Sequence, residues 1–492
     1  MMKCLTRLIP WIGLASAAMA MGQAIPTTPP PNGPIVRSPD LSQLGAQLAG
    51  RPLTLDEAIR LTFTVNRSIA QARANLFFFQ GKTMEAYAAL NPTLSTALEA
   101  IQLNDSVDSK YLTVLDPKSL SQPIGKVFAS QNVDQKFAGV TADLPIDISG
   151  SIRAAASQAR FQEIAYRLDI DRTRNQVISD VKAAFYDALR AHALVRVAEE
   201  DLKNSQDRLK DAQDRLAARV VTKFDVLRAE TDFAASQQQL ITARNVEKTN
   251  IAVLNTIIGI QVDTAEEISD QGAVVQPETA KTDELTAGGK LGPGYDRDLS
   301  EAMAHRPELQ EADAFESAAR KGIEVARKTQ LPSLNLSWTY LYAPNAGGSS
   351  PINHSWVAEA LLSIPIFDGG VARARTKEAQ GNLAGTIVSK RQAVDQVTLE
   401  VEQAFLAVNE AQQRVTVANA TLVEAKDAFS LAQVRYKEGV TAVQGLSPLL
   451  EVSDAQSALT LAESNQVNAL YDFNRAQARL DRALGRYASP VK

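Results

Sequence analysis

The stretch of sequence that decides the fold runs from Val177 to Leu216 and reads VISDVKAAFYDALRAHALVRVAEEDLKNSQDRLKDAQDRL. Small or apolar residues recur along it at alternating spacings of four and three, the heptad pattern of a helix that packs lengthwise against other helices. These positions are Val177, Val181, Ala184, Ala188, Ala191, Val195, Ala198, Leu202, Ser205, Leu209, Ala212 and Leu216. Neither glycine nor proline occurs between Gly150 and Gly259, so we expect one helix from Ser151 to Ala218 and an antiparallel return helix from Lys223 to Ile258.

A second copy of this pattern follows 220 residues later. Leu144-Pro145-Ile146, just before the first long helix, recurs as Ile364-Pro365-Ile366. The heptad positions recur in the same phase at Val397, Val401, Ala404, Val408, Ala411, Val415, Ala418, Leu422, Ala425, Phe429, Ala432 and Tyr436. Pro92-Thr93-Leu94 likewise matches Pro332-Ser333-Leu334 at a shift of 240, and Leu254 to Gly259 matches Leu480 to Gly485 at a shift of 226. We therefore predict a duplicated half-molecule rather than a solenoid of short repeats.

The return helix of the first copy covers only about half the length of the long helix beside it. A further predicted helix, from Leu55 to Leu90, supplies a similar length. We expect these two helices to stack end to end against the long one.

The segments before each long helix change to a period of two, which is typical of strands with one apolar and one polar face. In the first copy the apolar positions are Leu94, Leu98, Ala100, Ala138, Val140, Ala142, Leu144 and Ile146. In the second copy they are Leu334, Leu336, Trp338, Tyr340, Tyr342, Trp356, Ala358, Ala360, Leu362, Ile364 and Ile366. The sequence thus predicts a pair of strands in front of each helical hairpin.

The N-terminus has the pattern of an export signal. Residues 1–7 are basic, residues 8–19 are apolar, and Ala18-Met19-Ala20 predicts cleavage after Ala20. A membrane anchor is the alternative, but the apolar run is shorter than the ~20 residues that a spanning helix needs. Cys4, the only cysteine, lies inside this segment. We expect a signal peptide at 1–20, a Pro-rich leader at 21–52, repeat 1 at 53–259, a linker at 260–300, repeat 2 at 301–487 and a tail at 488–492.

Strands of about ten residues with one apolar face fit either an ordinary half-buried sheet or a transmembrane β-barrel with a wet interior. The export signal and the lack of a later apolar stretch of spanning length favour the barrel. Four strands cannot close a barrel, so we expect an oligomer. A dimer would make eight strands around side chains, and a trimer would make twelve around an aqueous pore.

Composition and residue types exclude several classes of function. With 51 basic and 56 acidic residues the net charge is −5, which is not expected to attract nucleic acid. The three histidines, His192, His305 and His354, are far apart, which disfavours a zinc site or a histidine-based catalytic triad. No glycine-rich loop of the phosphate-binding kind precedes a helix. We therefore expect neither an enzyme nor a bound cofactor or metal.

Two functions fit the pattern: an export channel, or a soluble periplasmic coiled-coil protein such as an adaptor or structural spacer. The heptads suit both. The duplicated strand pairs suit only the channel, which is therefore preferred.

Four motifs in a fixed order carry a family resemblance. They are Leu53-Thr54-Leu55-Asp56-Glu57-Ala58, Arg306-Pro307-Glu308-Leu309, Ile364-Pro365-Ile366-Phe367-Asp368-Gly369-Gly370 and Ala483-Leu484-Gly485. With the duplication, they make the chain from Leu53 to Tyr487 resemble the outer-membrane efflux protein (TolC) family. The resemblance implies a mainly α fold with a β-barrel part: a homotrimer in the outer membrane, whose twelve-stranded barrel continues as a periplasmic α-helical tunnel. It also implies passive export in contact with a periplasmic adaptor and an inner-membrane pump of RND or ABC type.

The resemblance also implies a gate at the periplasmic tip, lined by a ring of acidic residues. Glu451 and Asp454 match the two ring acids, and their spacing of three places them on one helix face. A trimer would gather six such carboxylates, which should favour cations. Two solvated acids on a helix remain the alternative.

Other tip residues partly match the family. Asp225 and Tyr436 match the tip aspartate and tyrosine, and Gly439 matches the tip glycine of the second copy. Arg219 stands where the first copy would carry that glycine. Thr441 replaces a linking arginine, and residues 442–447 are an insertion. We expect Asp225, Tyr436, Gly439 and Arg219 to make the tip contacts.

Overall fold

The computed structural model describes residues 52–102, 134–264, 268–270, 273–277, 293–342, 354–438 and 448–487. The expected signal segment with Ala20, nearly all of the leader, the tail at 488–492, and Gly439, Thr441 and the insertion at 442–447 lie outside these ranges. Among the helices of the described part, none is long and apolar enough to cross a membrane.

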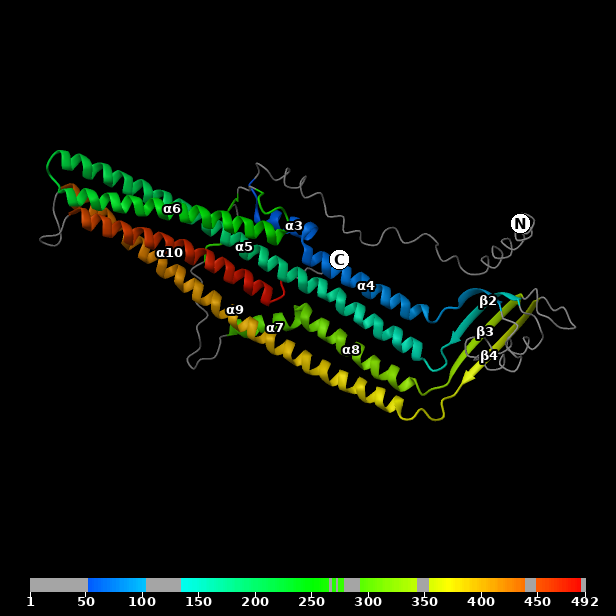
Figure 1. Ribbon diagram of the computed structural model, residues 1–492. Helices are drawn as coiled ribbons and strands as arrows, with labels where there is room; N and C mark the ends of the chain where they lie inside the picture. Colours follow the sequence, from blue (N-terminus) through cyan, green and yellow to red (C-terminus); the bar gives the residue numbers. More distant parts are fainter. Residues whose placement is uncertain are drawn as a thin grey trace, which may run out of the picture.

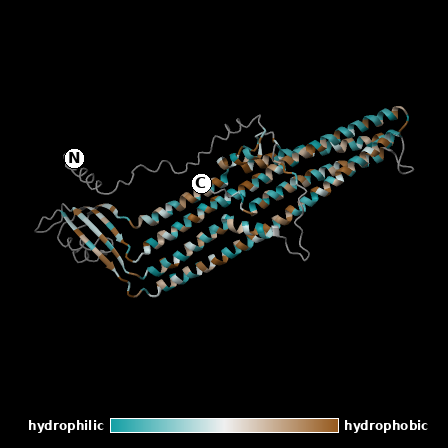
Figure 2. Cartoon of the chain, turned by 180° about the vertical axis from the view of Figure 1, so that it is seen from behind, coloured by the Kyte–Doolittle hydropathy of each residue, from teal (hydrophilic) through white to brown (hydrophobic). Residues whose placement is uncertain are grey.

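Two long helical hairpins dominate the molecule, as the heptads predict. The first comprises α5 (Ser151–Ala217) and α6 (Lys223–Ile258), and the second comprises α9 (Val371–Glu438) and α10 (Pro448–Ala483). Both point away from a small sheet at the other end of the molecule (Figure 1). The heptad positions of α5 are largely buried, with Val181, Ala188 and Ala212 fully covered. Hydrophilic and hydrophobic residues are interspersed along the helices (Figure 2).

Four shorter helices pack alongside the long helices α5 and α9 (Figure 1). They are α3 (Leu55–Val65), α4 (Arg67–Ala88), α7 (Pro293–His305) and α8 (Pro307–Lys328). The expectation of one unbroken helix from Leu55 to Leu90 is wrong, because the chain turns at Asn66. The Asn66 side chain accepts hydrogen bonds from the backbone N–H groups of Ser68 and Ile69, which caps α4, and donates one to the carbonyl oxygen of Ile257 at 2.8 Å.

Each short-helix pair meets the end of a return helix at a glycine. Gly259, after α6, has φ +101°, and a Cβ there would lie 2.9 Å from the carbonyl oxygen of Val65. Gly485, after α10, has φ +75°, and a Cβ there would lie 3.1 Å from the backbone of His305. The two joints are equivalent in the duplication, and each brings backbone against backbone. The expected end-to-end stacking is thereby confirmed.

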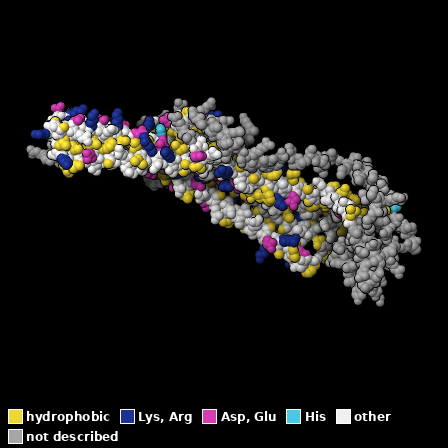
Figure 3. Space-filling model, turned by 45° about the horizontal axis from the view of Figure 1, so that its top comes forward, with side chains coloured by type: hydrophobic (Ala, Val, Ile, Leu, Met, Phe, Trp, Pro, Cys, Tyr) yellow, Lys and Arg dark blue, Asp and Glu magenta, His cyan; other side chains and the backbone are white. Residues whose placement is uncertain are grey.

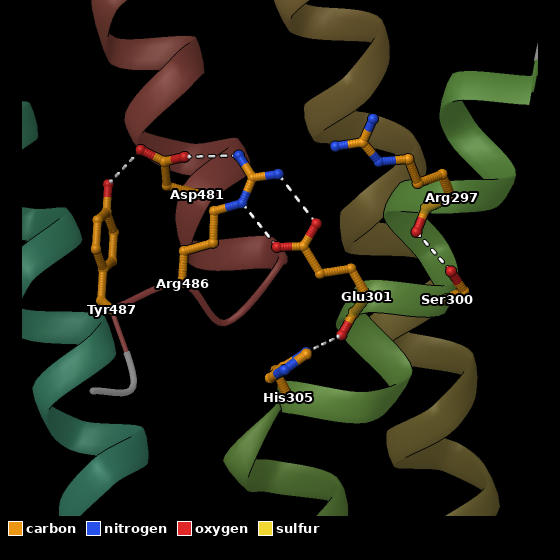
Figure 4. Close-up of polar contacts among 7 residues, drawn as sticks. All are labelled: Arg297, Ser300, Glu301, His305, Asp481, Arg486 and Tyr487. Carbon is orange, nitrogen blue, oxygen red and sulfur yellow. Dashed lines mark hydrogen bonds and ion pairs between the residues drawn. The ribbon is translucent and has the colours of Figure 1, made fainter. Parts of the chain in front are cut away.

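Ion pairs and hydrogen bonds also hold the end of the second copy against α7 (Figure 4). Arg486 binds both carboxylate oxygens of Glu301, at 2.8 and 3.0 Å, and contacts Asp481 at 3.4 Å. Hydrogen bonding from Arg486 lowers the pKa of Glu301 below its ordinary value. The Tyr487 hydroxyl donates to the backbone oxygen of Ala478 at 3.0 Å and lies 3.3 Å from Asp481. The chain after α10 is therefore tied to the start of the second repeat.

The helices form one layer with two open edges (Figure 1). The long helix α5 contacts α4 and α6, and it also contacts α8 and α10. The long helix α9 packs against α8 and α10. One edge of the layer is therefore made by α4 and α6, and the other by α9.

The sheet contains β1 (Thr93–Gln102), β2 (Asp134–Ile146), β3 (Ser333–Tyr342) and β4 (His354–Ser363), antiparallel and in sequence order. Pairings such as Leu98 with Ala138 and Ala142 with Trp338 collect the predicted apolar positions on one face. Thr141 and Thr339 share a hydrogen bond of 3.2 Å on the other face. The two-faced sheet is confirmed, but β4 ends at Ser363 and does not reach the predicted Ile366. Within the described residues, β1 pairs only with β2 and β4 only with β3, so the outer edge of each is unpaired.

Candidate functional site at the hairpin tips

The ends of both hairpins lie at the same end of the molecule, opposite the sheet (Figure 1). Tyr436, near the end of α9, is joined there to the first hairpin. Its hydroxyl donates a 2.6 Å hydrogen bond to the Asp211 carboxylate of α5, and the Arg215 guanidinium lies 4.2 Å from the centre of its ring. Arg215 also holds Asp211 at 3.0 Å. Burial, together with the bond to Asp211, raises the pKa of Tyr436 well above its ordinary value.

Asp211 and Arg215 are tip residues that the sequence did not single out. Their spacing of four on α5 is the only signal, and it also fits an ordinary surface ion pair. The sequence instead suggested Asp225 beside Tyr436. Asp225 caps its own helix: its carboxylate accepts from the backbone N–H and the hydroxyl of Thr222 at 2.9 and 2.7 Å. Its negative charge makes a minor contribution to the raised pKa of Tyr436.

Arg219 occupies the turn between α5 and α6 in a left-handed conformation, with φ 58°. The N–H of Arg219 bonds to the Leu216 carbonyl, and the N–H of Val220 bonds to the Arg215 carbonyl, both at 2.9 Å. This is the helix-ending turn that normally carries glycine. The backbone thus keeps the conformation of the missing glycine although the side chain differs.

Glu451 and Asp454 lie in the first two turns of α10, beside the tip. Glu451 is partly buried in the first turn, where the positive end of the helix dipole favours a carboxylate. The Asp454 side chain is 68% exposed, and the Arg228 guanidinium of α6 lies 3.8 Å away. Both acids are therefore at the end of the hairpin that the family resemblance implies.

A largely buried network of hydrogen bonds, centred on Asp201, joins α10 to the first hairpin near the tip. The Asp201 carboxylate of α5 accepts hydrogen bonds from Ser236 of α6 at 2.6 Å, and from Thr460 and Gln456 of α10 at 3.0 and 3.4 Å. Ser453 adds a 2.6 Å bond to Asp232, its neighbour on α6. The sequence did not predict this Asp201 network, because its residues flank the heptad positions and resemble solvent-exposed polar residues.

A second charged cluster lies between α5 and α8, nearer the middle of the layer. The Arg172 guanidinium contacts Asp169 on its own helix and lies 3.2 Å from Glu311 of α8. Burial, against the opposing effect of Arg172, raises the pKa of Glu311 to about 7, and the charges of Asp169 and Glu308 add to the shift. The Arg172 guanidinium thus forms ion pairs with both Asp169 and Glu311.

This cluster predicts a pH dependence. The folded protein holds the Glu311 proton more tightly than the unfolded chain does, so the stabilisation is complete near pH 4 and is lost as the pH rises through about 7. Glu311→Gln is expected to flatten the fall in melting temperature between pH 5 and pH 8. Glu324→Gln, on the same helix, is the control: the Glu324 side chain is 46% exposed and pairs with Lys321 one turn away, so this variant should leave the slope unchanged. An unchanged slope in Glu311→Gln would contradict the assignment.

Nothing in the described ranges suggests a reaction centre. They include no group of three or more His, Cys, Asp or Glu side chains that could hold a metal ion. At the tip, Tyr436, Asp211 and Arg215 join α9 to the first hairpin, whereas Asp225 and Arg219 shape the turn within that hairpin. The arrangement is a layer of helices with polar contacts between the hairpins at the end opposite the sheet.

Comparison with known proteins agrees with this arrangement. The profile of the family described as "Outer membrane efflux protein" matches residues 59–260 and 299–486. The pyoverdine export outer membrane protein OpmQ of Pseudomonas aeruginosa is 24% identical over 389 residues, covering 78% of this chain and 76% of that protein. The cation efflux system protein CusC of Escherichia coli is 22% identical over 314 residues, covering 62% and 64% of the two chains.

Solved structures show the same fold. The outer-membrane channel OprN matches with a TM-score of 0.68 at 19% identity, over 88% of this chain and 91% of that one. The outer membrane protein VceC from Vibrio cholerae matches with a TM-score of 0.69 at 18% identity, over 88% and 96%. The alternative of a soluble periplasmic adaptor or spacer is thereby set aside. With its duplicated hairpins, its four-stranded sheet and the profile match to both halves, the chain belongs to the outer membrane efflux protein family.

Proposed function

We propose that three copies of this chain close into a ring that forms the exit duct of a tripartite efflux or type I secretion system. The duct would receive its cargo from an inner-membrane pump through a periplasmic adaptor and release it outside the cell by passive flow. The outer membrane is the location of the family, and channels rather than enzymes make up its members.

The open edges carry this proposal. On one side the molecule ends in β1, α4 and α6, and on the other it ends in β4 and α9. An unpaired strand edge presents a row of free backbone N–H and C=O groups with which the strand of another chain can pair. The even number of strands lets β4 of one copy run antiparallel to β1 of the next around a whole ring. The edge helices also expose apolar side chains, such as Met84 of α4 and Val417 of α9. Figure 3 shows such residues spread between charged ones along the helical part.

Ring size follows from the interior of the barrel. Eight strands, from two copies, would be filled by side chains. Twelve strands, from three copies, leave room for water. The polar face of the sheet, with Thr141 and Thr339 at its middle, is suited to line such a pore.

At the other end, the tip would act as the gate. Three copies of Glu451 and Asp454 would surround the narrow end and favour cations. The contact between Tyr436 and Asp211 would hold α9 against the first hairpin when no partner is docked. The adaptor is expected to meet this same end, because it is the part of the molecule farthest from the sheet.

Planar bilayer recording tests the proposal. The purified protein is expected to form cation-selective pores, and replacing Glu451 and Asp454 together with alanine should weaken both cation selectivity and block by trivalent cations. Glu230→Ala, an exposed acid on α6, is the matched control for a lost charge. Absence of any conductance would contradict the duct, whereas unchanged selectivity would remove only the two acids from the gate.

A further inference from the structure

The duplication is reproduced in the register of the sheet. In the first copy Thr93 pairs with Asp143, and in the second copy Ser333 pairs with Ser363. Adding 240 to the first-strand number and 220 to the second-strand number converts one pair into the other. These are the shifts seen in the sequence, so the two strand pairs are equivalent residue for residue.

The molecule also contains one junction between copies, where β2 meets β3. There Ala142 pairs with Trp338, and Ile146 pairs with Leu334. This junction joins the second strand of one repeat to the first strand of the next repeat. In a ring of identical chains, the only other junction of this kind is the one between β4 of one chain and β1 of its neighbour.

We propose that this intermolecular junction copies the register of the internal one. Applying the same two shifts to the β2–β3 pairs places Leu362 opposite Leu98 of the neighbouring copy, and Ile366 opposite Leu94 of that copy. The strand β4 then extends by three residues, through Ile366. The inference rests on the proposed ring and specifies which residues form its seam.

The extent of the strands supports this register independently. β2 continues to Ile146, because β3 lies beside it. β4 ends at Ser363, three residues short of the equivalent point, although the sequences at 144–146 and 364–366 match. A strand that lacks its neighbour has no hydrogen-bond partners for these last residues. The difference between the two equivalent strands is what a missing partner would cause.

Both edges of the sheet carry exposed apolar side chains on its apolar face. On the apolar face, the side chains left uncovered at the two edges include Leu98 at 83%, Leu94 at 68%, Leu362 at 53% and Ile366 at 96%. The proposed register brings them together in pairs across the seam. Apolar side chains directly opposite each other on neighbouring strands stabilise a sheet.

The helices extend the seam by the same rule. Inside one chain, α5 and α8 approach closely where a Cβ on Gly322 would lie 3.3 Å from the Gln158 amide nitrogen. The shifts convert Gln158 of α5 into Glu378 of α9, and Gly322 of α8 into Lys82 of α4. The seam would therefore set Glu378 beside Lys82 of the next copy, with opposite charges. Both side chains are exposed in the single chain.

Disulfide trapping tests the register. In a Cys4→Ser background, Leu98→Cys is combined in turn with cysteine at five β4 positions on the same face: Ala358, Ala360, Leu362, Ile364 and Ile366. Within one chain β1 and β4 are three strand spacings apart, roughly 14 Å, too far for a disulfide. Any bond must therefore join two chains. The yield of covalent trimer on non-reducing gels is expected to peak at Leu362, at least tenfold above Ala358.

A second pair tests the helical part of the seam. Lys82→Cys with Glu378→Cys should cross-link between chains, whereas Lys82→Cys with Gly385→Cys, two turns along α9, should not. A peak at another β4 position, or equal linking by Gly385, would overturn the register. Native mass spectrometry of the uncrosslinked protein tests the ring separately from the register, because it reports how many chains assemble. A trimer that links in a different register overturns the inference alone, and a monomer in detergent that links with no pair overturns the ring as well.

Discussion

Arg306→Ala is expected to lower the free energy of unfolding by about 3 kcal/mol, because it removes the cation from a buried charge cluster. Arg306 is 2% exposed at the break between α7 and α8. Its guanidinium binds Glu400 of α9, lies 3.4 Å from Glu308 and donates at 3.2 Å to the carbonyl oxygen of Arg482. One side chain thus connects three helices at the joint of the second copy.

The loss would leave Glu400 half-buried without its main partner. Burial alone would raise the pKa of Glu400, but hydrogen bonds from Gln396 and Arg306 keep it below its ordinary value. This part of the stability is therefore present above the carboxyl's ordinary pKa and is lost as the pH falls. The variant should accordingly lose less stability at pH 4 than at pH 7.

Guanidinium unfolding followed by far-ultraviolet circular dichroism would measure the effect. Arg306→Lys keeps the charge but cannot contact all three partners, so we expect an intermediate value. A loss below about 1 kcal/mol for Arg306→Ala, the size typical of a surface pair, would contradict the role assigned to the cluster.

Gly259→Ala should cost a similar amount, about 3 kcal/mol, from two sources that add. The φ of +101° is unfavourable for alanine, and the new Cβ would lie 2.9 Å from the carbonyl oxygen of Val65. Neither atom can move easily, because the oxygen is part of the Val65 backbone and the position of the Cβ is fixed by the backbone of residue 259. The midpoint of thermal unfolding is the measurement.

Gly370→Ala is the matched control. Gly370 has a similar φ, +91°, but a Cβ there meets nothing within 4 Å. It should therefore show the conformational cost alone, about 1 kcal/mol. Equal losses in the two variants would mean that the close approach at Gly259 contributes nothing.

The sequence predicted most of the architecture because the architecture is repetitive. Heptads and period-two segments are local patterns, and the second copy confirmed each of them. The helix break at Asn66 was not expected because no proline follows Asn66, although the equivalent break 240 positions on is marked by Pro307. At Asn66 the side chain instead bonds to Ile257, 191 positions along the chain. The end of β4 also differed, because residues 364–366 have a strand pattern but no neighbour within the chain.

The contacts at the hairpin tips were harder to predict than the arrangement of helices and strands. The position of Glu451 and Asp454 follows from the family resemblance and from the helix bounds. The partner of Tyr436 does not, because Asp211 and Arg215 resemble any i, i+4 surface pair until α9 is placed beside them. The Asp201 network was missed for the same reason. Its four polar side chains come from three helices and become neighbours only when those helices are packed together.

The two different edges of the molecule have a consequence for how the proposed trimeric ring would be built. When two chains join through β4 and β1, the product still carries one free edge of each kind, so it is as reactive as a single chain. Only the arrival of the third chain removes both edges at once. In the proposed ring, dimers should therefore be short-lived intermediates, and the concentration of free chains, rather than the stability of any one chain, should set the rate at which closed rings appear.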